Sequence, residues 1–402
     1  MAGSDDDVVR WAASGAMALT GRAAGPALGP PAGLVPMVDG VGARITAATG
    51  LEHDWLALLG ERAALAGLSR DGDRSCGGHT RLLPTSDGWL AVSIARPDDL
   101  GLLPAWLGAD PGWTDLDHER WDVVAGLVAG QRTGELVDQG ALLGLPIAGL
   151  GEVGGSPGSS GPFDAPNVGL GADGGRRDLD LPRTSLGDAT PLGLAGAAVV
   201  DLTGLWAGPL CGGLLAEAGA DVVKVESTSR PDGARWGPKA FFELLNGGKR
   251  EVSVDLQTAG GVEQLRDLIL RADVVLESSR PRALEHLGLV ATDLLERGPQ
   301  VWLSITGHGR AANRVSFGDD GAVAGGLVVH DDRGPCFCAD AVADPLTGLA
   351  ATAEVVEALQ RGGRWLVEVP LAAVAARAAG PTLPPGDHPV APPRARGVGH
   401  GT

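Results

Sequence analysis

Residues 199–219, VVDLTGLWAGPLCGGLLAEAG, decide the fold class of this chain. The apolar run at 198–202 has the length of a strand, a glycine-bearing turn follows at 203–208, and 209–218 have helical spacing with a proline near the first turn. A second strand is predicted at 221–226, DVVKVE. The pattern therefore predicts a βαβ crossover of the nucleotide-binding type, in which a helix N-terminus can face an anion.

The glycines of the turn argue against a dinucleotide site. Gly204, Gly208 and Gly212 are spaced four apart and do not form the G-x-G-x-x-G pattern. An NAD-dependent oxidoreductase, in which Glu226 would hold a ribose, is therefore disfavoured and would be revealed by NADH binding.

Four further sequence blocks follow in order. They are FFELLNGGKREVSVDL (241–256), DVVLESSRPRALEHLGL (273–289), SITGHGR (304–310) and ADPLTGLAAT (343–352). Together with DLTGLWAGP and DVVKVE, this series resembles the class III CoA-transferases, the family of formyl-CoA and carnitine CoA-transferases, with alpha-methylacyl-CoA racemase as a relative. The resemblance implies an α/β fold: a Rossmann-like parallel-sheet domain that binds CoA, and a smaller α+β domain.

The order of the segments is unusual for that family. HTRLLPTSDGWLAVSI (79–94) predicts a hairpin with Asp87-Gly88 as its turn, and resembles the family's small domain, which normally follows the nucleotide-binding half. Residues 11–50 echo 322–354, so the front of the chain is a partial repeat. The domains expected are a partial repeat and small α+β domain (1–153), a linker (154–193), the Rossmann-like CoA-binding domain (194–378) and a disordered tail (379–402).

Composition limits the partners. The net charge of −18 argues against nucleic acid and anionic membranes, whereas residues 223–250 are locally basic, as a polyanionic CoA ligand would require. No apolar stretch approaches the ~20 residues of a membrane span, and the acidic N-terminus is unlike a secretory signal, so we expect a cytoplasmic protein. The Cys336-x-Cys338 pair lacks a second pair, and neither a metal site nor a disulfide framework is predicted.

The resemblance implies an aspartate nucleophile. It would attack the donor thioester, form a mixed anhydride, and pass CoA through an aspartyl-CoA thioester to an acceptor carboxylate. Alignment places this residue at Asp332, twelve positions before Asp344, and a slip of one residue would exchange it for Asp331. The alternative is that both aspartates form an ordinary solvated turn. We expect no permanently bound cofactor, with the CoA thioester as substrate.

The resemblance also assigns contacts to CoA. The residues at the family's CoA-lining positions are Trp206, Ser227, Val254, Gln257, Ser278, Ser279, Arg280, His286 and Thr306. Arg230, Arg280 and Lys249 could meet phosphates, and Lys249 and Arg250 belong to the basic segment on which CoA binding is expected to depend. The match is uneven, because Ser279 replaces a common aromatic and Ser227, Gln257 and Thr306 replace common basic side chains.

The sequence disfavours one further alternative, a racemase, and leaves another open, an idle subunit. A racemase needs a histidine about 30 residues before Asp344, whereas position 314 is Arg and His308 comes six residues too early. A catalytically idle CoA-binding or structural subunit is supported by the lost basic contacts and by Ala27, which occupies the position of Asp332 in the partial repeat. By analogy with the interlocked dimers of the family, we expect a homodimer or a heteromer with a related chain.

Overall fold

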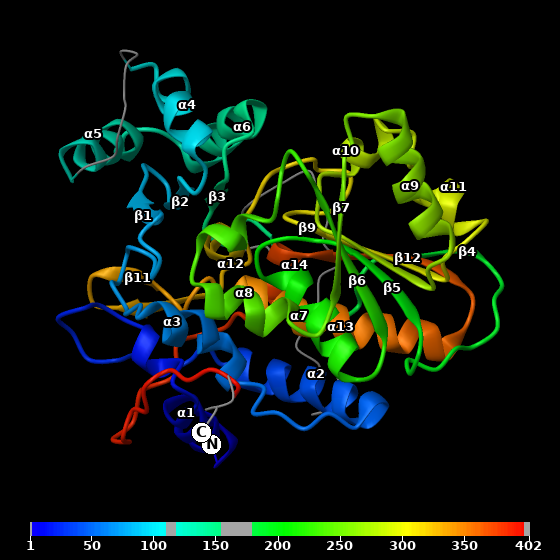
Figure 1. The fold of residues 1–402 in the computed structure, drawn as a ribbon. Helices are drawn as coiled ribbons and strands as arrows, with labels where there is room; N and C mark the ends of the chain where they lie inside the picture. Colours follow the sequence, from blue (N-terminus) through cyan, green and yellow to red (C-terminus); the bar gives the residue numbers. More distant parts are fainter. Residues whose placement is uncertain (1, 110–117, 154–178, 398–402) are drawn as a thin grey trace.

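A large, mostly parallel sheet forms the centre of the molecule (Figure 1). The computed structural model describes residues 2–109, 118–153 and 179–397. The sheet has the order β4-β12-β9-β8-β5-β6-β7, and all neighbours are parallel except β4, which is antiparallel to β12. Its strands are β4 Arg183–Gly187, β5 Ala198–Leu202, β6 Asp221–Ser227, β7 Arg250–Val254, β8 Val274–Glu277, β9 Val301–Thr306 and β12 Arg364–Pro370.

Apolar residues cover both faces of this sheet, as expected for parallel strands. Val199 of β5 belongs to one buried cluster and its neighbour Val200 to another, because successive side chains of a strand point to opposite faces. Helices α7 (Ala207–Glu217) and α13 (Ala343–Arg361) contribute to the first cluster, and α9 (Ala259–Leu270) and α11 (Ala291–Leu295) to the second. The predicted strand-turn-helix-strand unit is confirmed.

Shorter helices lie in the segments that connect or follow the strands of the large sheet. They are α8 Lys239–Asn246, α10 Pro281–Glu285, α12 Gly318–Ala324, α14 Leu371–Ala378 and the 3-10 turn η3 Gly233–Trp236.

The N-terminal block, residues 2–79, packs on the large core. Its elements are α1 Ala2–Ser14, η1 Met17–Leu19, α2 Leu34–Thr49, η2 Ala57–Gly60 and α3 Glu61–Ala66. Trp11 and Leu34 lie in the same buried cluster as Val199. Helix α2 packs against α13 (Figure 1). Arg44 Nη2 lies 3.1 Å from Glu354 Oε1. The partial repeat therefore lies beside the segment that it resembles.

A second, smaller unit has a core of its own. The strands β1 (Thr80–Pro84), β2 (Trp89–Ser93) and β3 (Ile147–Gly149) form an antiparallel sheet, and the hairpin predicted at 79–94 is confirmed. Its helices are α4 Pro97–Leu107, α5 His118–Ala129 and α6 Thr133–Leu143. A separate two-stranded hairpin consists of β10 (Val328–Asp331) and β11 (Gly334–Phe337).

Two expected boundaries differ from the structure. Residues 154–178 of the expected linker lie outside the described residues, but its later part includes β4, an edge strand of the large sheet. The expected disordered tail is ordered up to residue 397: Arg396 pairs with buried Glu61 at 2.8 Å, and Thr382 bridges to Pro31. These polar and backbone contacts fix a segment whose composition alone indicates a loop. Among the described helices, none has the length and apolarity that a membrane crossing requires.

Candidate functional site

The carboxyl ends of the parallel strands form the edge where most predicted CoA contacts lie. The chain leaves β5 toward β6 and β7 on one side and continues through β8, β9 and β12 on the other, and such a divergence is where open α/β sheets bind ligands. The predicted residues at this edge are Trp206 after β5, Ser227 and Arg230 at β6, Val254 and Gln257 at β7, Ser278, Ser279 and Arg280 after β8, and Thr306 at β9. His286 follows α10 and is exposed.

These residues differ in how accessible they are. Arg230, Gln257, Ser278 and Arg280 are exposed, whereas Val254 is part of the apolar core. The Ser278 hydroxyl accepts a hydrogen bond from the Gly204 amide at 3.2 Å and so joins the ends of β5 and β8.

Lys249 and Arg250 lie elsewhere. The Lys249 side chain is fully buried and donates to Asp201, the Pro209 carbonyl and Asn246, each at 2.8 Å. Arg250 begins β7 and pairs with Asp221 at the first residue of β6, at the opposite, amino edge of the sheet. Arg250 therefore lies at the amino edge, and the Lys249 ammonium reaches the end of β5 only as a buried ion-pair partner, so the structure leaves neither side chain free to contact a ligand at the carboxyl edge.

Buried ion pairs hold the β5–α7 turn instead. Asp201 accepts from the Thr203 amide at 2.9 Å, and Asp232 accepts from the Leu205 amide and from Lys224, both at 2.8 Å. Leu205 has φ +68°, a backbone conformation that side-chain-bearing residues rarely adopt. These partners fix a strained turn at the edge of the sheet.

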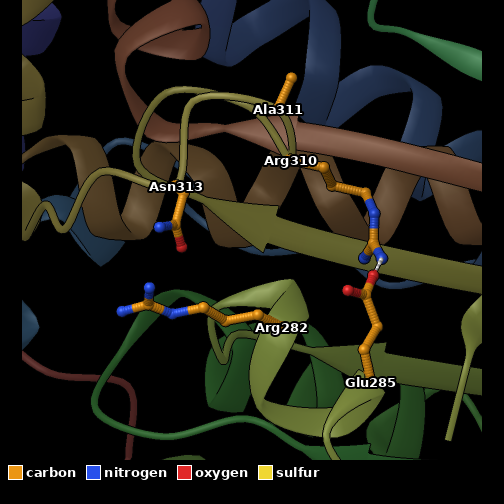
Figure 2. Close-up of a pocket in the computed structure, with 5 residues that line it drawn as sticks. All are labelled: Arg282, Glu285, Arg310, Ala311 and Asn313. Carbon is orange, nitrogen blue, oxygen red and sulfur yellow. Dashed lines mark ion pairs between the residues drawn. The ribbon is translucent and has the colours of Figure 1, made fainter.

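Arginines from several loops converge at this edge. Burial, together with the charges of Arg282, Arg96 and Arg230, lowers the pKa of the Arg280 guanidinium. A pocket of about 400 Å³ lies beside them, lined by Arg282, Glu285, Arg310, Ala311 and Asn313. Figure 2 shows Arg310 directed toward Glu285, at a nitrogen–oxygen distance of 3.6 Å. The grouped positive charge of this region can hold an anionic ligand.

Four aspartates, here called the acidic cluster, meet at the start of α13: Asp319, Asp320, Asp340 and Asp344. Asp320 and Asp340 are 0 % exposed, whereas Asp319 and Asp344 are partly exposed. Burial raises the pKa of Asp319 and Asp320 to about 6 and that of Asp344 to about 7; Arg62 opposes this for Asp319 and Asp344, and the other three aspartates add to it for Asp344. Carboxyl groups that titrate near neutrality are a mark of reactive sites.

The acidic cluster lies next to the turn that carries Trp206. The Arg62 guanidinium donates to Asp340 at 2.8 Å and lies 5.3 Å from the centre of the Trp206 ring. Gly348 of α13 approaches the Ala207 carbonyl so closely that an added Cβ would lie 2.7 Å from it. The start of α13 therefore abuts the start of α7, at the carboxyl end of β5.

Backbone strain coincides with this cluster. Ala339 and Ala341, on either side of Asp340, have φ +52° and +42°. A Cβ on Gly318 would lie 2.6 Å from Asp344 Oδ2, so this position requires glycine. Strained positions of this kind persist at functional sites when surrounding contacts fix them.

Asp332 lies in a different place. It occupies the exposed two-residue turn between β10 and β11, and this hairpin contacts Arg22, Trp89 and Thr382. Burial acts to raise the pKa of the neighbouring Asp331 carboxyl, but the hydrogen bonds from Arg22 and from the Arg333 amide, together with the charges of both arginines, outweigh it and lower the pKa. The structure does not bring Asp332 to the residues predicted to bind CoA, and its role stays a prediction.

The sequence interpretation did not single out Arg62, Asp319, Asp320 or Asp340. Asp344 carried a signal, since it heads the DPLTG helix start, and the consecutive Asp319-Asp320 before an apolar run was another. Arg62 carried none, because its partner is 278 residues away in the chain.

The fold defines a mixed α/β protein built on a large parallel sheet. The family model of CoA-transferase family III matches residues 194–397, half of the chain, and the protein belongs to that family.

Two CoA-transferases match part of the chain. The chain is 34% identical over 186 residues to a succinate–glutarate CoA-transferase of Agrobacterium fabrum, covering 41% of this chain and 46% of that protein. It is 32% identical over 175 residues to a formyl-CoA:oxalate CoA-transferase of Escherichia coli, covering 40% and 42%. A solved CAIB/BAIF family protein from Brucella suis is 32% identical, covering 46% and 55%, with a TM-score of 0.43. The chain spans less than half the length of the two transferases.

Proposed function

We propose that this chain transfers CoA from an acyl-CoA donor to a carboxylic acid through an aspartyl intermediate. Membership of family III and the similarity to two CoA-transferases support transfer to and from CoA thioesters. The strand order β7-β6-β5-β8-β9-β12 supports a Rossmann-like sheet, because the same order recurs in doubly wound dinucleotide-binding folds.

The nucleophile has two candidates. Alignment with the family favours Asp332, as predicted from the sequence. The geometry favours Asp344, a partly exposed residue of the acidic cluster, because the charge of Arg62 acts on its carboxyl and Arg62 lies over Trp206 at the edge where the predicted CoA contacts gather. This position is the observation that supports the proposal most strongly.

The same sequence of bond-forming and bond-breaking steps can be written for Asp332 or for Asp344. The carboxylate oxygen attacks the thioester carbonyl, the C–S bond breaks, and CoA leaves as a thiolate. The thiolate attacks the aspartyl carbonyl of the anhydride and releases the donor acid, which leaves an aspartyl thioester. The acceptor carboxylate then attacks this thioester, and the released thiolate takes the acceptor acyl group and regenerates the aspartate.

Trapping with hydroxylamine tests the proposal and separates the candidates. The chain is incubated with a panel of acyl-CoAs and hydroxylamine and digested with trypsin, which cleaves after Arg314, Arg333 and Arg361. Asp332 then lies in peptide 315–333 and Asp344 in peptide 334–361, so mass spectrometry assigns the hydroxamate. A hydroxamate in neither peptide, with CoA still bound in calorimetry, would favour the idle CoA-binding alternative and contradict the proposal.

The remaining expectations on the protein's surroundings belong to the same proposal. We infer that acyl-CoA and carboxylic acid are its small-molecule partners, that CoA is substrate and not a resident cofactor, that it works in the cytoplasm, and that it assembles as a homodimer or with a related chain. The oxidoreductase alternative gains no support from Glu226, whose carboxylate is engaged by Arg235 and by the Asp232 amide at 2.6 Å.

A further inference from the structure

We propose that Arg62 is a positioning residue for Asp344, supplied by the N-terminal block to a site whose carboxylates all come from the family-matched half of the chain. This inference rests on the proposed function, with Asp344 as the reacting carboxylate. It concerns residues 2–79, which lie outside the match to the family model.

The contacts of Arg62 fix its guanidinium between two parts of the site. Arg62 donates from Nε and from Nη2 to the two oxygens of Asp340, and this paired geometry sets the plane of the group. Its side chain is 29 % exposed, whereas that of Asp340 is 1 % exposed. On its other side, the guanidinium lies over Trp206, at the first turn of α7.

The positive charge of Arg62 acts not only on its partner Asp340 but also on two other carboxyl groups of the acidic cluster. It lowers the pKa of Asp344 and of Asp319 against the effect of burial. The other titratable groups facing this region are Asp320 on α12, Cys76 and His79 in the N-terminal block, and Asp340 itself. Burial and carboxylates raise the pKa of the Cys76 thiol, and burial with Arg62 and Arg74 lowers that of His79, so both groups are neutral at pH 7.

A cation is required here for a simple reason. Four carboxyl groups close together disfavour the ionised form of each, and an aspartate must be ionised to attack a thioester. The two hydrogen bonds to Asp340 hold the Arg62 guanidinium in place, so its positive charge acts on Asp344 from a fixed position. The N-terminal block therefore contributes to the reaction and does not merely cover the core.

The test uses the full chain and three variants. Arg62→Met removes the charge, Arg62→Lys retains it, and Arg44→Met is the matched control. Arg44 also belongs to the N-terminal block and pairs with Glu354, a buried carboxylate of α13, the helix that carries Asp344; the Arg44 side chain is 26 % exposed and that of Glu354 is 0 % exposed. Melting temperatures first establish that each variant is folded.

The informative measurement is the pH profile of kcat/KM. We expect Arg62→Met to move the acid limb to higher pH by about one unit, which is a roughly tenfold loss below the limb with recovery above it. Arg62→Lys should retain most of the wild-type limb, and Arg44→Met should leave it in place. An equal loss at every pH, or an unmoved limb, would overturn the proposal.

A second measurement does not depend on turnover. The infrared difference spectrum between the chain and its Asp344→Asn variant reports the protonated carboxyl of Asp344, and we expect its titration to move upward in the Arg62→Met background. If this titration moves while no hydroxamate forms on either Asp344 or Asp332, Arg62 controls Asp344 as proposed and the proposed function alone fails. If it does not move, the proposal on Arg62 is wrong, whatever the transferase activity.

Discussion

Lys249 Nζ lies 2.8 Å from Asp201 Oδ2, and neither side chain has any exposed surface. The pair joins the start of β7 to the end of β5 beneath the turn that carries Trp206. The buried pair therefore stabilises the turn that carries Trp206.

The first prediction concerns this pair. Lys249→Met should destabilise the fold by about 3–5 kcal/mol, because it leaves the Asp201 carboxylate buried without a counter-charge. Urea unfolding measures the loss. Arg250→Ala is the control, since its exposed pair with Asp221 should contribute less than about 1 kcal/mol. Equal effects of the two substitutions would contradict the assignment.

The second prediction concerns CoA affinity. Arg280→Ala and Arg282→Ala should each weaken CoA binding by about 1.5–3 kcal/mol, the range for hydrogen bonds to charged groups, and the loss should shrink in high salt. Isothermal calorimetry at two salt concentrations is the measurement. Arg250→Ala, at the amino edge, should leave the affinity unchanged; a loss there as large as at Arg280 would return the amino edge to the binding site.

The third prediction separates the candidate nucleophiles. Asp344→Asn should abolish transfer and Asp332→Asn should retain it, because Asp344 belongs to the acidic cluster that Arg62 joins to the Trp206 turn, whereas Asp332 lies in an exposed turn. The wild-type rate should rise with pH through about 7, the pKa to which burial raises Asp344, since the ionised form attacks. The reverse result in the two variants would restore Asp332 as the nucleophile.

The fourth prediction is a pH dependence of stability. The pKa of Asp344 is about 7 in the fold against 3.8 for an exposed aspartate, so the folded state holds its proton more tightly than the unfolded state. Its favourable contribution is complete below about pH 4 and is lost as the pH rises through 7. Asp344→Asn should therefore gain on the order of 1–3 kcal/mol relative to wild type between pH 4 and 8, measured by urea unfolding. Asp332→Asn, at an exposed turn, should give a difference that does not change over this range.

The fifth prediction concerns assembly. We expect light scattering at micromolar concentration to give a homodimer, as the family resemblance implies. A fully active 40.6 kDa monomer would show instead that α2, packed against α13 within one chain, replaces the contact between subunits.

Local sequence patterns predicted the central part of the fold well. The alternation around Val199 and Val200, the helix from Ala207 and the hairpin around Asp87-Gly88 depend on neighbours in the chain, and the structure has all three. The later part of the expected linker could not be recognised as a strand, since β4 is an edge strand whose stability comes from pairing with β12.

The candidate site was predicted in part. The order of sequence blocks located the carboxyl-edge residues, because each ends a strand or follows one. Lys249 and Arg250 were grouped with them by charge alone, and charge does not reveal which end of a strand a residue occupies. Arg62 could not be found, since its contacts with Asp340 and Trp206 exist only after residues far apart in the chain have folded together.

Helix α13 has almost no surface of its own, because most of its 19 residues are buried between the large sheet and α2. A fragment that begins at residue 194, where the family match begins, would lack α2, which packs on α13, and would also lack Arg62. An expression fragment of residues 194–397 should therefore precipitate and be inactive even when refolded. For the same reason, sequence drift on α2 must be matched by compensating drift on α13, and the two segments are expected to evolve as a pair.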